Sequence, residues 1–189
     1  MEAEALHKEN TKYTYADYCT WDDEQRYELI NGEVYAMSPA PKFVHQDIIS
    51  KLNTKLFNFL KDRDCKVIPA PLDVRLNADG DDDTVVQPDI VVICDRSKIT
   101  EEGCVGSPEM VIEVTSKSTA RRDKTTKFDL YKKYGVKEYW IVDPEINTVS
   151  VHLLKDGEYV IRAYSDTDTV PVTVLEGCMI DLSEVFDES

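Results

Sequence analysis

Three short segments rich in β-branched and aromatic residues constrain the fold more than any other feature of the sequence. They are VVQPDIVVIC (85–94), EMVIEV (109–114) and EYWIV (138–142). Because successive residues of a strand point to opposite faces, a segment that is apolar at nearly every position needs cover on both faces. These segments therefore predict buried strands of a sheet that lies between other layers.

Two amphipathic helices are predicted beside this sheet. Over about residues 44–60, apolar side chains recur at three- and four-residue intervals, as on a helix with one buried face. A second helix, over about 123–134, ends at Gly135, a residue suited to a left-handed C-terminal cap. With an alternating strand at 72–76, the core order is α, β, β, β, α, β. We expect an α/β fold of mixed α+β type, with a central mixed sheet flanked by helices.

Antiparallel segments are predicted on both sides of this core, which spans about residues 15–144. Asn31-Gly32 lies between two short apolar runs, and this dipeptide suits the positive φ angles of a tight hairpin turn. A C-terminal extension over about 145–189 has two β-rich runs around Asp156-Gly157 and a last strand at 170–174. Since no linker or internal repeat divides the chain, we expect one domain over residues 1–189.

The composition is that of an ordinary globular protein. Of 189 residues, 42% are apolar and 31% are charged, the usual balance for a chain with a core. No apolar run approaches the roughly 20 residues that span a bilayer. The N-terminal MEAEALHKEN is polar and acidic, unlike a secretory signal. We therefore expect a cytoplasmic protein with no membrane partner.

The cysteines, histidines and acidic loop predict no special chemistry. Five cysteines are odd in number, widely spaced and without a CxxC pair, which argues against a disulfide framework and a zinc site and agrees with a reducing cytoplasm. Three histidines lie in unrelated segments, without the spacing of a zinc hydrolase. In the acidic loop, Asp82 stands where a calcium loop begun at Asn77 needs glycine, and Pro88 stands where it needs glutamate, so we expect residues 77–83 to form a solvated turn.

The charge pattern leaves two interpretations open. The net charge of −15 opposes nucleic-acid binding, because that binding neutralises phosphates with lysine and arginine. Residues 117–137, however, hold eight basic and two acidic side chains. This stretch is either a solvated helix with its flanks or a phosphate-binding face.

Two carboxylates interrupt the predicted buried strands. Asp89 shares a strand face with Val91, and Glu113 shares one with Val111. A buried carboxylate needs a cation, a metal or a hydrogen-bond network. Lys127 lies inside the apolar stripe of the second helix and is a candidate cation, with Lys124 as its rival. The trio of acids and lysine is either a buried ion pair without catalysis or part of a catalytic site.

Phosphodiester hydrolysis is the chemistry that would use all three groups. Two carboxylate ligands leave Mg²⁺ most of its waters, and the metal neutralises phosphate charge and acidifies a bound water. The lysine would orient or activate that nucleophile. Metal, acids and lysine would then each have a role.

Five segments, in this order, resemble a known family. They are YELINGEVYAMSPAP (27–41), His45-Gln46, QPDIVVI (87–93), SPEMVIEVTSKST (107–119) and RRDKTTKFDLYKKYGVKEYWIVDP (121–144). Over about residues 15–144 the chain resembles the PD-(D/E)XK nucleases and, within them, the Uma-two family of restriction endonucleases, formerly classed as a domain of unknown function. The resemblance implies a restriction-endonuclease-like core.

The same resemblance implies roles for particular acids. Asp89 and Glu113 are implied to bind the metal, and Glu28 is implied to be a further acidic residue of the site. From its place in a hairpin, Glu28 is either a site residue or a solvated surface side chain. His45 either begins the first helix as a polar residue or lines the cleft.

The lysine departs from the general nuclease motif. Thr115 stands where (D/E)XK has lysine, and the resemblance implies that the lysine has moved to the following helix, where Lys127 matches. Lys117 is a local variation close to the motif. The choice between Lys127 and Lys124 stays open in the sequence.

Three hypotheses of function follow. The leading one is a metal-dependent endonuclease with DNA as substrate, Mg²⁺ or Mn²⁺ as cofactor, and Asp89, Glu113, Lys127 and Glu28 in the site. The second is a non-catalytic nucleic-acid-binding or interaction module that keeps the fold and uses the acids and lysine as a salt bridge. The third, drawn from the negative charge, is a homodimeric structural protein. A nuclease that cuts both strands would also gain from a homodimer.

Overall fold

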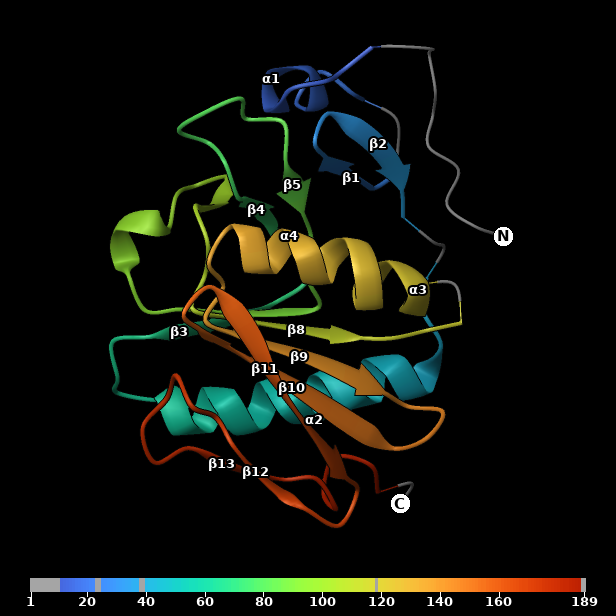
Figure 1. Cartoon of the computed structure of the whole chain (residues 1–189), viewed down its shortest axis with the longest axis vertical. Coiled ribbons are helices and arrows are strands. Elements are labelled where there is room, and N and C mark those ends of the chain that lie inside the picture. The colour runs from blue at the N-terminus through green and yellow to red at the C-terminus, as the bar shows by residue number, and fades with distance from the viewer. Residues whose placement is uncertain (1–10, 23–24, 38–39, 118, 188–189) are drawn as a thin grey trace.

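The structure is a computed structural model that describes residues 11–22, 25–37, 40–117 and 119–187. Its centre is a six-stranded sheet with helices on both faces (Figure 1). The strand order is β11 (Glu158–Ser165), β10 (Thr148–Lys155), β9 (Glu138–Asp143), β8 (Met110–Val114), β6 (Ile90–Ile93) and β3 (Lys66–Pro69). β8 and β9 are parallel and the other neighbours are antiparallel. The predicted mixed sheet between layers is confirmed.

Helix α2 (Phe43–Leu60) covers one face of this sheet. Its stripe of Ile48, Leu52 and Leu56 packs in one core with Ile90 and Ile112 from the strands. These positions recur at helical spacing, so their burial follows from the sequence pattern. The predicted helix over 44–60 is confirmed.

The other face carries a composite helix. It consists of α3 (Ala120–Arg122), a π-helical turn η2 (Asp123–Lys127) and α4 (Phe128–Lys133). Leu130 and Tyr131 pack in a second core with strand residues of β6 and β8. Gly135 has φ +79°, the left-handed value of the expected cap. The prediction of a plain helix over 123–134 missed the π-helical turn.

A second, smaller sheet lies above the α4 face (Figure 1). Its order is β2 (Glu33–Ala36), β1 (Tyr27–Ile30), β5 (Val85–Val86), β4 (Asp73–Arg75) and β7 (Gly103–Val105). Asn31 and Gly32 have positive φ angles of 50° and 81°, which confirms the predicted hairpin. The strand expected at 72–76 is β4, which belongs to this sheet and not to the central one. The short helix α1 (Tyr15–Tyr18) packs beside the hairpin through Tyr18.

The C-terminal extension adds strands to the central sheet. β10 and β11 form the predicted hairpin next to β9, and β12 (Thr169–Pro171) pairs with β13 (Met179–Asp181) below α2. The strand expected at 170–174 therefore ends at Pro171. Glu138 is buried and accepts hydrogen bonds from Trp140 Nε1 at 2.7 Å and Val174 N at 2.9 Å, so it holds the extension to the sheet.

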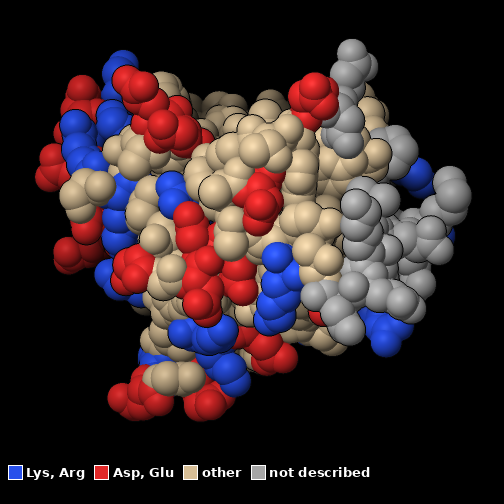
Figure 2. All heavy atoms as spheres, turned by 90° about the horizontal axis from the view of Figure 1, so that it is seen from above, with Lys and Arg blue, Asp and Glu red and all other residues tan. Residues whose placement is uncertain are grey.

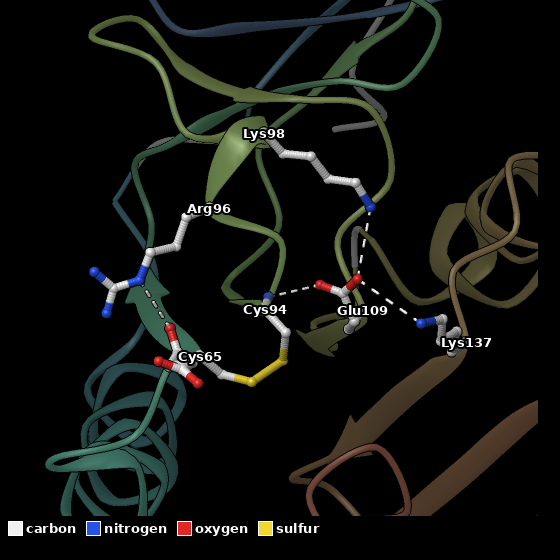
Figure 3. Close-up of a disulfide and its surroundings, with 7 residues drawn as sticks. Cys65, Cys94, Arg96, Lys98, Glu109 and Lys137 are labelled. Carbon is white, nitrogen blue, oxygen red and sulfur yellow. Dashed lines mark hydrogen bonds and ion pairs between the residues drawn. A yellow bond between two sulfur atoms is a disulfide. The ribbon is translucent and has the colours of Figure 1, made fainter.

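One cysteine pair corrects the prediction of unpaired thiols. Cys65 and Cys94 form a disulfide between the ends of β3 and β6, because the register of these strands sets the two residues opposite each other. Figure 3 shows Glu109 beside it, accepting from Cys94 N at 2.7 Å and lying 3.6 Å from Lys98 Nζ. The spacing of 29 residues gave no sequence signal, since a sheet register brought the cysteines together.

Residues 76–81 of the acidic segment form turns, and Asp82 Oδ2 lies 2.6 Å from Arg75 Nη2. No helix among the described residues is both long and apolar enough to cross a membrane.

Candidate active site

Glu113 lies on the central strand β8 and points toward α4. Only 4% of the residue is exposed. Its Oε1 accepts hydrogen bonds from Lys127 Nζ at 2.7 Å and from Tyr131 OH at 2.8 Å. Two residues from one helical segment therefore compensate the buried carboxylate.

Glu28 reaches the same lysine from the N-terminal hairpin. It is fully buried, and its Oε1 lies 2.8 Å from Lys127 Nζ and accepts from Gln87 N at 3.0 Å. Its Oε2 lies 3.5 Å from Arg122 Nη2. β1 docks on β5, which directs Glu28 inward, so Glu28 is not a solvated hairpin residue.

Lys127 is the lysine that bridges the acids. It is 3% exposed and lies in the π-helical turn. Lys124 instead pairs with Asp143 at 3.0 Å, and Lys117 has an exposed side chain 3.3 Å from Glu145. The geometry therefore distinguishes Lys127 from the two neighbouring lysines.

Asp89 lies immediately before β6, at the more open side of the cluster. Its Oδ2 accepts from Val114 N at 2.7 Å, which places the carboxylate beside the backbone next to Glu113. His45 Nε2, from the first turn of α2, is 3.5 Å from the same oxygen. The side chain of Asp89 is 19% exposed. Asp89 and His45 thus line one side of the site, and Glu113 lies behind them.

Burial and neighbouring charges shift the ionisation of the cluster. Burial raises the pKa of Glu113 to about 8, a shift that Lys127 opposes and three neighbouring carboxylates increase. Burial alone would lower the pKa of Lys127, but Glu113 and Glu28 outweigh it and raise that pKa above its ordinary value. Burial also favours neutral Glu28, yet Lys127 and Arg122 prevail and lower its pKa. Lys127 is therefore a permanent ammonium group.

Carboxyl groups outnumber the cationic side chains in this cluster. Its carboxyl groups belong to Glu28, Asp89, Glu113 and Asp123, and its permanent cations are Lys127 and Arg122. With all four carboxyls ionised, two negative charges remain uncompensated. The pKa of His45 rises because its hydrogen bond to Asp89 and the attraction of that carboxylate outweigh burial, and a protonated His45 would offset part of this excess.

With its carboxyls ionised, above the raised pKa of Glu113, the cluster has the charge to accept a divalent cation. Across the described ranges, no three His, Cys, Asp or Glu side chains lie close enough together to hold a metal by themselves. Mg²⁺ commonly binds through one or two carboxylates and keeps several waters. Asp89 and Glu113 could together supply that number of carboxylate ligands.

Sequence reasoning missed Arg122, Tyr131 and Asp123 as members of the cluster. Tyr131 follows Lys127 by four residues, so its place on the same helix face was available from the sequence. Arg122 precedes Lys127 by five residues, and the π-helical turn brings both to Glu28. A helix period of 3.6 residues does not predict that alignment.

Comparison with known proteins defines the class. The fold is shared with a crystal structure from Anabaena variabilis titled as a putative nuclease belonging to DUF820, with a TM-score of 0.74 and 21% identity. The match covers 92% of this chain and 97% of that one. This likeness shows that the two proteins share a fold.

The family follows from the sequence match. A family model described as "Putative restriction endonuclease", Uma2, matches residues 14–183, so the chain belongs to the Uma2 family. Two uncharacterised proteins of Synechocystis sp., slr1290 and sll1609, are 28% and 27% identical to it. The first match covers 80% of both chains, and the second covers 69% of this chain and 74% of its relative. The resemblance expected from the sequence is confirmed.

Proposed function

We propose that this protein is a metal-dependent endonuclease that hydrolyses DNA, with Asp89 and Glu113 as ligands of Mg²⁺ or Mn²⁺. The observation that carries the proposal is their meeting at neighbouring strands of the central sheet. Asp89 accepts the N–H of the residue next to Glu113, and Lys127 from the following helix contacts Glu113. When bound, the metal would supply charge neutralisation at the phosphate and a bound water of lowered pKa.

The chain's own residues would position this chemistry. Lys127, with its raised pKa, acts as a fixed positive charge and not as a base that removes a proton. It orients Glu113 and can attract the negative charge of a phosphate. Glu28 holds the ammonium group from the other side at 2.8 Å. Glu28 therefore contributes by positioning Lys127.

The surface charge predicts weak and salt-dependent DNA binding. Figure 2 views the molecule from above, and acidic and basic side chains lie intermixed on the described part of that face, beside a broad uncharged area. With a net charge of −15, attraction to DNA depends on local cations such as exposed Arg121 and half-exposed Lys124. Since such attraction falls steeply with salt, we propose that cleavage is strongest at low ionic strength. The proposal includes action in the cytoplasm, where DNA and Mg²⁺ are both present.

A binding module without catalysis is the second candidate. The observation in its favour is that Lys127 already lies within 2.8 Å of both buried acids. Such an ion pair is complete without metal. In this case Asp89 would contribute only its hydrogen bond to Val114.

A plasmid-nicking assay separates the two candidates. We expect Mg²⁺- or Mn²⁺-dependent nicking by the unmodified protein, at least a hundredfold loss in Asp89→Asn, and little change in Asp129→Asn. Asp129 is a matched control because it is exposed on α4. Nicking that survives Asp89→Asn would contradict the proposed metal site. Absence of nicking at every metal concentration and salt would favour the binding module.

A further inference from the structure

Strand β11 forms an unprotected edge of the central sheet. It pairs with β10 over eight consecutive positions without a bulge, and its sequence EYVIRAYS contains neither proline nor glycine. In the part of the chain that the structure describes, β10 is its only strand partner. Alternate residues of such a strand direct N–H and C=O groups outward, where another strand can pair with them.

The opposite edge of the same sheet is protected. β3 has only four residues, begins with Lys66 and ends with Pro69. A short strand, a lysine and a proline are common means of preventing edge-to-edge pairing. β11 lacks a proline and is twice as long, so it is the edge available for association.

Exposed apolar side chains mark the same strand. Val160 is 44% exposed and Ile161 is 55% exposed. Being adjacent on a strand, they point to opposite faces, so both faces of the sheet are open at this edge. An apolar edge strand exposed to water is a site for pairing with another chain.

We propose that β11 pairs antiparallel with β11 of a second copy of this chain, around a two-fold axis at Val160. Residues directly opposite each other in a sheet point to the same face. A two-fold axis perpendicular to the sheet therefore sets even-numbered residues of one β11 opposite even-numbered residues of the other, and odd opposite odd. Centring the axis on Val160 sets Glu158 opposite Arg162 of the second copy, and this pair occurs twice. Centring it on Arg162 would oppose two arginines, which is unfavourable.

Charge complementarity therefore selects a second copy as the partner. The side chain of Glu158 is 78% exposed, and its Oε2 lies 3.1 Å from Lys132 Nζ. The carboxylate therefore remains accessible to an arginine of a second copy. Arg162 is exposed. The apolar contact at the centre is Val160 against its own copy, and Tyr159 lies opposite Ile161. The central sheet then continues across the dimer, and the β11 edge of each copy is no longer exposed.

Sedimentation equilibrium of the full chain tests this dimer. The unmodified protein, with a chain mass of 21.6 kDa, is expected to sediment with twice that mass at micromolar concentration. Arg162→Glu opposes like charges at both symmetric positions and is expected to raise the dimer Kd about tenfold or more. The double variant Glu158→Arg/Arg162→Glu restores opposite charges and is expected to restore the dimer. Lys66→Glu, on the protected edge, is the control and should change nothing.

Each result decides the proposal. A monomer over the whole concentration range would overturn it, as would a dimer indifferent to Arg162→Glu or a loss that the double variant does not rescue. Circular dichroism checks the fold of each variant. If Arg162→Glu fails to fold, Glu158→Arg provides the same test, because it opposes two arginines in the same register.

Discussion

Replacing Lys127 by methionine tests the buried cluster most sharply. The substitution keeps the length and apolar stem of the side chain but removes the ammonium group from Glu28 and Glu113. All three residues are at least 96% buried, so solvent cannot replace the lost charge. Removing one partner of a buried ion pair typically costs about 3–5 kcal/mol. We expect a loss of this size in the free energy of unfolding at pH 8.

The loss of unfolding free energy in Lys127→Met should increase with pH. Without the ammonium group, burial raises the folded-state pKa of both carboxyls above the unfolded value of about 4.3. The neutral forms then stabilise the fold fully below about pH 4.3, and this contribution is lost as the pH rises through the folded-state pKa values. The destabilisation by Lys127→Met is therefore smaller at pH 5 than at pH 8. Adding Glu28→Gln should recover part of the loss at pH 8, because one buried charge is gone.

Urea denaturation followed by circular dichroism measures these free energies. Lys124→Met is the control, since its side chain is 49% exposed and a surface pair contributes about 0–1 kcal/mol. A loss below about 1 kcal/mol for Lys127→Met at both pH values would refute the buried bridge. A loss equal at pH 5 and pH 8 would refute its electrostatic origin.

Three further predictions concern other contacts. Tyr131→Phe removes the hydroxyl donor to Glu113 and should lower the free energy of unfolding by about 1 kcal/mol in urea, whereas no change would show that the bond is not formed. Burial lowers the pKa of His152, so stability should be complete above about pH 6.5 and fall at lower pH as the unfolded imidazole takes up a proton; His152→Gln should flatten this slope between pH 5 and pH 7. Reducing the Cys65–Cys94 disulfide, which closes a loop of 29 residues, should cost about 2–4 kcal/mol in the same assay, and an unchanged urea midpoint after reduction would contradict it.

The layers of the fold were predictable because their signals are local. Apolar runs predicted strands covered on both faces, helical spacing predicted α2, and Asn31-Gly32 predicted the hairpin. The assignment of β4 to the second sheet was not predictable, since strand partners are set by long-range pairing. The disulfide between Cys65 and Cys94 escaped prediction for the same reason.

The candidate site was predictable where its charged residues lie within apolar sequence. Asp89 and Glu113 stood out as carboxylates within apolar strands, and Lys127 as a cation within an apolar stripe. Burial of Glu28 depends on the docking of β1 against β5, which the sequence of the hairpin does not encode by itself. Arg122 needed the π-helical turn, and such turns lack a reliable sequence signal.

Binding of a divalent ion tests the central claim most directly. We would titrate Mn²⁺ into the protein by isothermal calorimetry at pH 8.5, which lies above the raised pKa of Glu113 of about 8, so that the ionised form of Glu113 prevails. The account predicts one site, weaker binding at pH 6.5 because Glu113 must release a proton, and loss of binding in Asp89→Asn but not in Asp129→Asn. Millimolar Mn²⁺ that gives no binding heat at either pH, or binding that Asp89→Asn leaves intact, would contradict a metal site at Asp89 and Glu113.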